Sequence, residues 1–332
     1  MKQTSKVLSV ILTLAMMFSV IVISAIPSSA ATYTWPTLKS GTTGYANEIT
    51  ALQYLLKSYG YYTPTPTGTF DATTTTAVKN FQTSKNLTSD GAVGTNTWTS
   101  LVSGRTVKRG SADADAAKAI QYLLKNKFGF SSIVIDGAYG NASIAAVSRF
   151  QRALTGSPLH TVVDGIVGSN TWNNLIAATK AQADITPMWY IYVLFPTNRN
   201  NIGNLYLYDA TGAQKLSMQC KGLGQNNGNW WLTNENTPLG CFGAELSAGT
   251  YDTASYGPYK VVQLNDSQVG TATKAAGGVA RSGVWIHSAG TNLTDLSSIR
   301  SHGCLKIKTA DHNSLVNQIT TLKGSGFVII SE

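Results

Sequence analysis

This sequence has unusually few charged residues: only 12% of its 332 residues are charged, against about a quarter in an ordinary globular protein. So low a charge beside 43% hydrophobic residues excludes an acidic solvating chain, a coiled coil and a wholly disordered chain. Acidic residues are fewer than basic residues, 16 against 25. The net charge of +9 is scattered along the chain and gives no nucleic-acid footprint. The length predicts two or three domains.

Cysteine is also scarce, with three residues that lie too far apart to form a disulfide scaffold. Cys220 and Cys241 can pair in an exported protein or stay as buried free thiols, and the sequence leaves both open. Either outcome leaves the third cysteine, Cys304, outside that pair.

Long hydrophobic runs are missing except at the N-terminus, where residues 7–26 form an apolar run. Lys2 and Lys6 precede this run, and the small residues 27–30 follow it, which is typical of a secretory signal. The alternative is an uncleaved membrane anchor, since about twenty apolar residues span a bilayer. We expect residues 1–30 to be a signal peptide, whose removal takes away two lysines and leaves a net charge of +7.

A unit of about 65 residues, a size marginal for independent folding, occurs twice. The motif Leu/Ile-Gln-Tyr-Leu-Leu-Lys begins at residues 52 and 120, and Phe-Gln recurs at residues 81 and 150. The motif Asp-Gly-x-Val-Gly-x-Asn-Thr-Trp begins at residues 90 and 164. The offset grows from 68 to 69 and then to 74, so the second copy has one extra residue and then five more. The five fall near residues 155–163, where Gly156 and Pro158 predict a loop.

Each copy predicts a small three-helix bundle, because apolar residues recur at helical spacing in three segments. The glycines of the Asp-Gly-x-Val-Gly motif are typical of a tight turn. We expect the bundles at residues 40–104 and 108–178. Their large aromatic side chains are expected in the core rather than against a ligand: Phe81, Trp98, Phe150 and Trp172.

This duplicated pattern resembles the peptidoglycan-binding domain type 1 family. The resemblance covers about residues 40–178 and implies binding to cell-wall glycan or stem peptide. A role as mere spacers is the alternative. The sequence does not locate the binding groove.

After Pro187 the helical spacing gives way to short β-rich runs, which predict a mainly β domain over residues 187–331. Thr211-Gly212 is a predicted hairpin turn, and residues 311–322 are the one clear helix of this part. The predicted strands are residues 189–195, 204–209, 215–220, 259–264, 283–287 and 327–330.

Chemistry is indicated by two short segments of this last part, Trp-Ile-His-Ser at residues 285–288 and Ser-His-Gly-Cys-Leu-Lys at residues 301–306. Cysteine catalysis needs a thiolate and a nearby base, and an imidazole can serve as that base. Gly303 allows backbone amides to point at a developing oxyanion. The spacing alone only suggests a nucleophile turn.

The two segments resemble the signature of the L,D-transpeptidase (YkuD-like) family, in which a His precedes Ser/Thr-His-Gly-Cys. Thirteen residues, 288–300, separate His287 from Ser301. The Thr-Pro-x-Gly-x-Phe segment at residues 237–242 and the later Asp311 and Leu315 also match. The resemblance implies a multidomain chain: two small all-α three-helix bundles followed by a mainly β YkuD-like domain.

The resemblance also implies the role of each residue. Cys304 would attack the carbonyl between the third and fourth residues of a stem tetrapeptide and form a thioester. His287 would activate Cys304, Ser288 would orient His287, and the amides of His302, Gly303 and Cys304 would hold the oxyanion. The amine of a second stem would then attack to give a 3→3 cross-link, whereas water would give L,D-carboxypeptidase activity. Carbapenems would acylate the same cysteine, and no cofactor is implied.

Ser301 and Lys306 are the predicted substrate-binding residues. Lys306 stands where the family usually has Arg or Asn, so it keeps a positive charge but lacks the planar fork of arginine. It can meet a substrate carboxylate only as a point charge.

A zinc site is the main alternative use of these side chains. His287, His302, Cys304 and His312 could be taken for a metal cluster, but they lack a Cys-x-x-Cys or His-x-x-x-His pair. We therefore predict no metal. His302 can also have a purely structural role.

Three classes of function compete. The first is a wall transpeptidase, and the second is another exported cysteine enzyme. Sortases separate His and Cys more widely, and NlpC/P60 peptidases place Cys first. The third is a non-enzymatic wall-binding protein, which intact Cys and His argue against. We predict a secreted, wall-associated monomer of a Gram-positive-type envelope that binds peptidoglycan stem peptides and glycan, with no nucleic acid and no membrane contact after signal cleavage.

Overall fold

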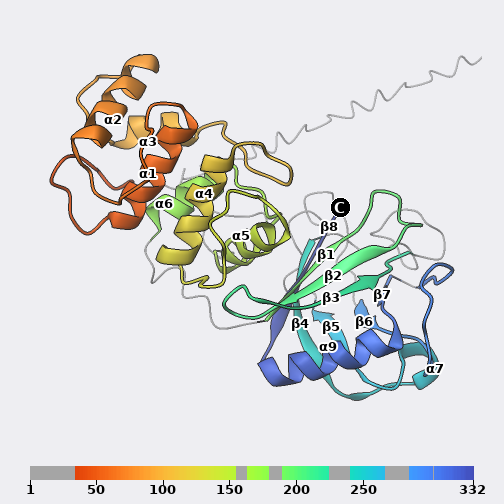
Figure 1. The fold of residues 1–332 in the computed structure, drawn as a ribbon. Helices are drawn as coiled ribbons and strands as arrows, with labels where there is room; N and C mark the ends of the chain where they lie inside the picture. Colours follow the sequence, from red (N-terminus) through yellow and green to blue (C-terminus); the bar gives the residue numbers. More distant parts are fainter. Residues whose placement is uncertain (1–33, 155–162, 179–188, 224–239, 266–283, 302) are drawn as a thin grey trace, which may run out of the picture. The chain divides into compact units, whose positions relative to one another are not determined.

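The computed structural model describes residues 34–154, 163–178, 189–223, 240–265, 284–301 and 303–332 (Figure 1). The expected signal peptide and the Thr-Pro-Leu part of the segment at residues 237–242 lie outside the described residues. No helix in these ranges is both long and apolar enough to cross a membrane.

The first repeat is a three-helix unit of α1 (Ala46–Ser58), α2 (Ala72–Ser84) and α3 (Thr95–Val102). The side chain of Asp71 begins α2, because it accepts a hydrogen bond from the amide of Thr74 at 2.7 Å. Trp98 of α3 is 0% exposed and donates its indole N–H to Pro36 O, so this aromatic side chain is core, as predicted.

The second repeat has α4 (Ala114–Tyr122), the π-helical turn η1 (Leu123–Lys127), α5 (Asn141–Ala153) and α6 (Ser169–Ala177). The turn η1 explains the one-residue drift between the copies. Tyr59 N bonds to Leu55 O in the first repeat, whereas Phe128 N bonds to Leu123 O in the second. The second repeat thus takes up its extra residue in a wider turn and keeps the rest of the helix in register.

A buried glutamine organises each turn of both repeats, in an arrangement that we call the glutamine clamp. In each clamp the side-chain oxygen accepts from the amide of a glycine with positive φ, and the side-chain nitrogen donates to the carbonyl of the next residue. The same nitrogen donates to the hydroxyl of a Ser or Thr in the following helix. The four pairs are Gln53 with Gly68, Gln82 with Gly91, Gln121 with Gly137 and Gln151 with Gly165.

The clamp holds turns of different length. The glutamine and its glycine are 15, 9, 16 and 14 residues apart in the four cases, yet the same bonds form. The five extra residues of the second copy lie between Gln151 and Gly165, and residues 155–162 of that stretch are outside the described part. Motif residues that recur in the sequence are therefore fold residues, because they close the turns.

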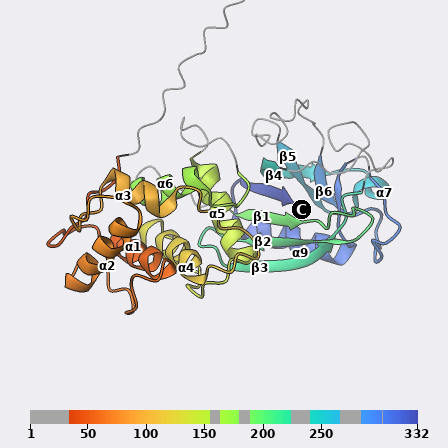
Figure 2. The same ribbon diagram turned by 90° about the horizontal axis from the view of Figure 1, so that it is seen from above.

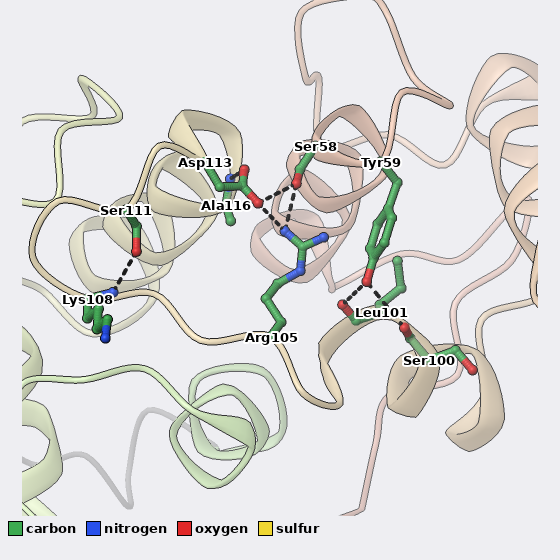
Figure 3. Close-up of polar contacts among 9 residues, drawn as sticks. All are labelled: Ser58, Tyr59, Ser100, Leu101, Arg105, Lys108, Ser111, Asp113 and Ala116. Atoms are coloured by element: carbon green, nitrogen blue, oxygen red, sulfur yellow. Dashed lines mark hydrogen bonds and ion pairs between the residues drawn. The ribbon is translucent and has the colours of Figure 1, made fainter.

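Polar contacts join the two repeats (Figure 3). The guanidinium of Arg105 lies 4.3 Å above the ring of Tyr59 and donates to Ser58 Oγ at 2.6 Å and to Asp113 Oδ2 at 2.5 Å. A second, buried ion pair joins Lys127 Nζ to Glu48 Oε1 at 2.8 Å. These contacts bind α1 to the start and the end of the α4–η1 helix.

The rest of the described chain builds one mixed sheet of eight strands in the order β3-β2-β1-β8-β4-β5-β6-β7 (Figure 1). The pairs β1–β8 and β6–β7 are parallel, and the others are antiparallel. Backbone bonds between Lys221, just after β3, and Lys306 of β7 join the two edges of the sheet. The strands are β1 (Tyr190–Leu194), β2 (Gly203–Tyr208), β3 (Gln214–Cys220), β4 (Gly240–Thr250), β5 (Lys260–Asn265), β6 (Trp285–His287), β7 (Leu305–Lys306) and β8 (Gly326–Ser331).

Helix α9 (Thr309–Leu322) covers one face of this sheet (Figure 2). Leu315 and Ile319 of α9 share a core with Ile191, Ile286 and Leu305 of the strands. Because side chains alternate along a strand, the neighbours of Ile286 and Leu305 point to the opposite face.

The predicted fold class is confirmed: helical repeats are followed by a mainly β part. The six predicted strands are present, and β2 and β3 pair as the predicted hairpin. The prediction missed β4, β7 and the short helix α7 (Thr253–Tyr256). Strand β4 is rich in Gly and Ala, which have low β propensity, so its pairing with β5 and β8 decides its structure.

Candidate active site

The parallel pairing of β6 with β7 brings the two predicted segments together. Ile286 lies opposite Leu305, and His287 lies opposite Lys306. Since Ile286 and Leu305 point into the core under α9, His287, Lys306 and Cys304, which directly precedes β7, share the other face. The predicted base and the predicted nucleophile are thus placed on one side of neighbouring strands.

Ser301 shapes the turn that carries Cys304. Its hydroxyl donates to Cys304 O at 2.8 Å and accepts from the amide of Gly303 at 3.1 Å. Its amide donates to Leu223 O at 2.9 Å, which ties the turn to the chain after β3. Gly303 has a φ of 110°, a conformation that other residues rarely adopt. The Gly303 amide is occupied by Ser301 here and is not turned toward an incoming oxygen.

His287 is 1% exposed and is held by a strong hydrogen bond. Its Nδ1 lies 2.6 Å from Ser288 O, so Nδ1 carries the proton and Nε2 presents a lone pair. Within the described residues Nε2 has no hydrogen-bond partner. Burial, followed by the Lys306 ammonium, lowers the pKa of His287 to about 3, against the effect of the Ser288 hydrogen bond. The imidazole is therefore neutral near pH 7 and can accept a proton at Nε2.

Lys306 is a buried cation at the same site, with 8% of its surface exposed. Its Nζ donates to Ser255 O of α7 at 3.0 Å and lies 3.2 Å from His287 Nδ1. Burial lowers the pKa of Lys306, and the charge of the Cys304 thiolate opposes that shift. The ammonium thus interacts with the histidine and the cysteine of this chain, whereas contact with a substrate carboxylate stays a prediction.

A second buried histidine, His312 of α9, lies behind Ser288. Its Nδ1 is 3.2 Å from Ser288 N and 3.0 Å from Ser288 Oγ, and its Nε2 is 2.7 Å from Lys260 O. Both His312 and Ser288 are 0% exposed. The sequence singled out His312 only as a candidate metal ligand.

Aromatic side chains line the same face beside His287. The ring of Tyr256 lies 4.8 Å from the ring of His287, and Trp285 lies 5.0 Å from Tyr256. Tyr251, 41% exposed, lies 4.7 Å from Trp285. These rings give the base an apolar flank.

The cysteines differ in environment. Cys220 is a fully buried free thiol in β3, and burial raises its pKa far above the ordinary value. Cys304 is at the edge of burial, with 9% of its surface exposed. The side chain of Cys241 lies outside the described part of the structure, so the predicted alternatives for it are unchanged.

The structure gathers most of the predicted site residues in one place: Cys304, His287, Ser288, Gly303, Ser301 and Lys306. His302 lies outside the described residues. In the described ranges no group of three or more His, Cys, Asp or Glu side chains is arranged to hold a metal ion. Reasoning from the sequence missed Ser255, Tyr256 and the position of His312, because they come from α7 and α9, and no local motif links them to the cysteine turn.

Comparison with known proteins identifies the repeats. A family model described as "Putative peptidoglycan binding domain" matches residues 45–101 and 113–175. An uncharacterized protein of Kitasatospora aureofaciens is 36% identical over 75 residues, which are 23% of this chain and 58% of that protein. The chain thus spans little more than half of this relative.

Several solved structures are similar at low identity. A fused zinc-dependent amidase/peptidase/peptidoglycan-binding protein of Clostridium acetobutylicum is 18% identical, over 68% of this chain and 99% of that one, with a TM-score of 0.25. An L,D-transpeptidase of Stackebrandtia nassauensis is 13% identical, over 91% and 98%, with a TM-score of 0.27. The helical cell shape determining protein of Campylobacter jejuni is 16% identical, over 44% and 48%, with a TM-score of 0.30.

TM-scores this low do not establish a shared fold. The assignment of the two repeats therefore rests on the match to the peptidoglycan-binding family model. Residues 45–101 and 113–175 are two peptidoglycan-binding domains, and the site described above belongs to the mainly β part that follows them.

Proposed function

We propose that the chain is an exported peptidoglycan L,D-transpeptidase, which forms 3→3 cross-links through an acyl-enzyme on Cys304. The two peptidoglycan-binding domains would hold it on the wall polymer that contains its substrate. Net positive charge suits an anionic wall polymer, although it also suits solubility alone.

The observation that carries this proposal is the neutral, oriented base beside the cysteine turn. His287 has its Nδ1 proton committed to Ser288 O, and its Nε2 lone pair is without a partner in the described residues. Such an imidazole can take the proton of a thiol and later return it to a leaving amine. A histidine in a purely structural role would normally have both ring nitrogens bonded.

The reaction would proceed in two halves. In the first, His287 Nε2 takes the Cys304 thiol proton while sulfur attacks the carbonyl between the third and fourth stem residues. The bond to D-Ala breaks, the departing amine receives the proton from His287, and a thioester is left on Cys304. In the second half, the side-chain amine of another stem attacks the thioester and loses a proton to Nε2. The new amide forms, and the protonated thiol is restored.

The positive charge of Lys306 would favour the thiolate during the first attack, because it lies on the same face of β7 two residues after Cys304. The amides of His302 and Cys304 remain the proposed oxyanion donors. The Gly303 amide would first have to leave Ser301 Oγ. Ser301 would therefore act mainly by holding the turn.

The test is intact mass of the mature protein after incubation with a carbapenem. We expect a single adduct on the wild type and none on Cys304→Ala. Because the Cys220 thiol is fully buried, Cys220→Ala should carry the same single adduct as the wild type. Absence of an adduct on folded protein with a titratable Cys304 thiol would contradict the proposal and favour a wall-binding protein.

Purified tetrapeptide muropeptides then test the reaction itself. Release of D-Ala with formation of 3→3 dimers is the expected result. Release of D-Ala with only tripeptide would instead identify an L,D-carboxypeptidase. Sedimentation of full-length Cys304→Ala with insoluble peptidoglycan checks the role of the two binding domains separately from the chemistry.

A further inference from the structure

The position of Ser288 between two buried histidines is not explained by the proposed chemistry alone. Its carbonyl lies 2.6 Å from His287 Nδ1, and its amide lies 3.2 Å from His312 Nδ1. Its hydroxyl lies 3.0 Å from the same nitrogen of His312. All three residues are buried, so water does not readily replace these bonds.

The donors and acceptors of this chain of bonds fix each other. Lys260 O is an acceptor, so His312 Nε2 at 2.7 Å must carry a proton. A neutral His312 then has its lone pair on Nδ1, where the Ser288 amide can donate to it. On the other side, Ser288 O is an acceptor 2.6 Å from His287 Nδ1, closer than Lys306 Nζ at 3.2 Å, so we assign the proton of His287 to Nδ1. The two histidines are therefore held in opposite tautomers by the residue between them.

We propose that His312 is a positioning residue for His287, acting through Ser288 so that His287 keeps its lone pair on Nε2, available to accept a proton. This inference rests on the proposed function, because it assigns His287 as the base for Cys304. It links four residues of three separate segments in one order: Lys260 of β5, His312 of α9, and Ser288 with His287 at the end of β6.

The backbone around this chain of bonds is built to leave room for it. A Cβ atom on Gly257 would lie 2.1 Å from Ser288 Oγ and 3.3 Å from His312 Nδ1. Gly257 also has a φ of 79°, which other residues adopt only with strain. Gly257 thus lets the backbone pass close to Ser288 and His312, at a position where a side chain would clash with the Ser288 hydroxyl.

Acid would break the arrangement at His312. Protonation puts a hydrogen on Nδ1, so the bond from the Ser288 amide is lost and only the Ser288 hydroxyl can still accept from this nitrogen. The charged and titratable groups that face His312 are the Lys306 ammonium, the ring of His287 and the phenol of Tyr259, whose ring lies 5.4 Å away. Burial is the first cause that lowers the pKa of His312, and Lys306 adds to it. His312 thus stays neutral to a lower pH than an ordinary histidine.

The direct test is the tautomeric state of the two rings, measured by ¹⁵N–¹H NMR of labelled protein, with His287→Gln and His312→Gln for assignment. We expect protonated Nδ1 for His287 and protonated Nε2 for His312 at pH 7. The same tautomer in both rings, or a His287 protonated on Nε2, would overturn the proposal. This readout does not depend on turnover, so it distinguishes a failed positioning role from a failed assignment of the reaction.

The kinetic test compares two substitutions of His312 by the rate of Cys304 acylation by a carbapenem. His312→Gln can accept from Ser288 and donate to Lys260 O, and it cannot titrate. We expect it to keep the rate within about threefold at pH 7 and to hold that rate to a lower pH than the wild type. His312→Leu loses both bonds and is expected to slow acylation by about tenfold or more.

A loss of stability alone is controlled by Val316→Ala, a core truncation one turn further along α9. If Val316→Ala slows acylation as much as His312→Leu, the role of His312 is structural and the proposal fails. The same conclusion follows if His312→Gln is as slow as His312→Leu, or if its acid profile matches the wild type. Should His312→Leu not fold, the tautomers and the His312→Gln pH profile still decide the question.

Discussion

The glutamine clamps of the peptidoglycan-binding domains and the candidate site of the mainly β part treat buried polar groups in opposite ways. In each glutamine clamp both polar atoms of the side chain are bonded, and the result is a closed turn. At the candidate site, Nε2 of His287 is buried and has no hydrogen-bond partner among the described residues, and the buried Lys306 ammonium forms no ion pair with a described carboxylate. Buried polar groups that are hydrogen-bonded stabilise a fold, whereas buried ionisable groups that lack a partner have shifted pKa values and are typical of functional sites. The same chain thus separates residues that hold structure from residues that can do chemistry.

Removing a clamp is expected to have the largest effect on stability of any single substitution. Gln82→Leu removes hydrogen bonds to the Gly91 amide, Ala92 O, Thr97 Oγ1 and Asp90 Oδ1. At about 1 kcal/mol for each lost bond, we expect the first repeat to lose about 4 kcal/mol of unfolding free energy. Hydrogen exchange of peptides from α2 and α3 measures it, with Thr83→Ala as an exposed control on the same helix. An equal fall in Cys304 acylation would show that the two parts are not separate in function.

Acid should destabilise the mainly β part more than the repeats. The pKa of His287 is depressed in the folded protein, so its imidazole stays neutral there. In the unfolded chain the same imidazole binds a proton below about pH 6.5. Unfolding free energy therefore falls as pH drops from 6.5 toward 3, by about 1.4 kcal/mol per pH unit for this one group. We expect exchange of β6 peptides to accelerate in this window and exchange of α1 to change less. If His287→Gln shows the same acceleration in β6, another group is responsible.

Replacing the buried cation should separate stability from reactivity. Lys306→Met fills a similar volume and removes a buried charge, so we expect unchanged or higher stability of the mainly β part. Without the ammonium, alkylation of Cys304 by iodoacetamide should slow about tenfold at pH 7, with its pH midpoint moved upward. Lys308→Met, two residues further on, is the matched control. An unmoved midpoint in Lys306→Met would show that this cation does not act on the thiol.

Loss of a helix cap is the smallest of these effects. Asp71→Ala removes the carboxylate that bonds Thr74 N at 2.7 Å and is expected to cost about 1 kcal/mol in the first repeat. Asp71→Ser keeps an acceptor and should retain most of that stability. Exchange at the start of α2 checks both, and acylation of Cys304 should be the same in the two variants. A full-sized loss in Asp71→Ser would mean that charge, not capping, matters there.

Much of the fold was open to prediction because it follows from short-range patterns. Duplicated motifs gave both repeats, and helical spacing placed Leu52 and Phe81 in the core. Strand-like runs placed six of the eight strands. Strand β4 was missed because Gly and Ala give no strand signal, and β7 because only two residues form it. Both exist because a neighbouring strand offers them hydrogen bonds.

The site was predictable only as far as its motifs reach. Cys304 and His287 stand in recognisable segments, and the sheet brings those segments together. The environment that sets their chemistry comes from elsewhere: Ser255 O holds Lys306 from 51 residues away, and His312 holds Ser288 from 24 residues away. The engagement of the Gly303 amide by Ser301 is a matter of turn geometry, which the order of residues does not specify.

The glutamine clamp also makes turn length an adjustable parameter. Separations from 9 to 16 residues between the glutamine and its glycine give the same bonds in the four turns of this chain, so the clamp forms with turns of different length. A short epitope or a fluorophore-binding tag placed between Gln151 and Asp164 should be tolerated, because both ends of that segment are anchored by the clamp itself. Such a tagged protein would report where the two peptidoglycan-binding domains hold the chain, without any change to the face that carries Cys304.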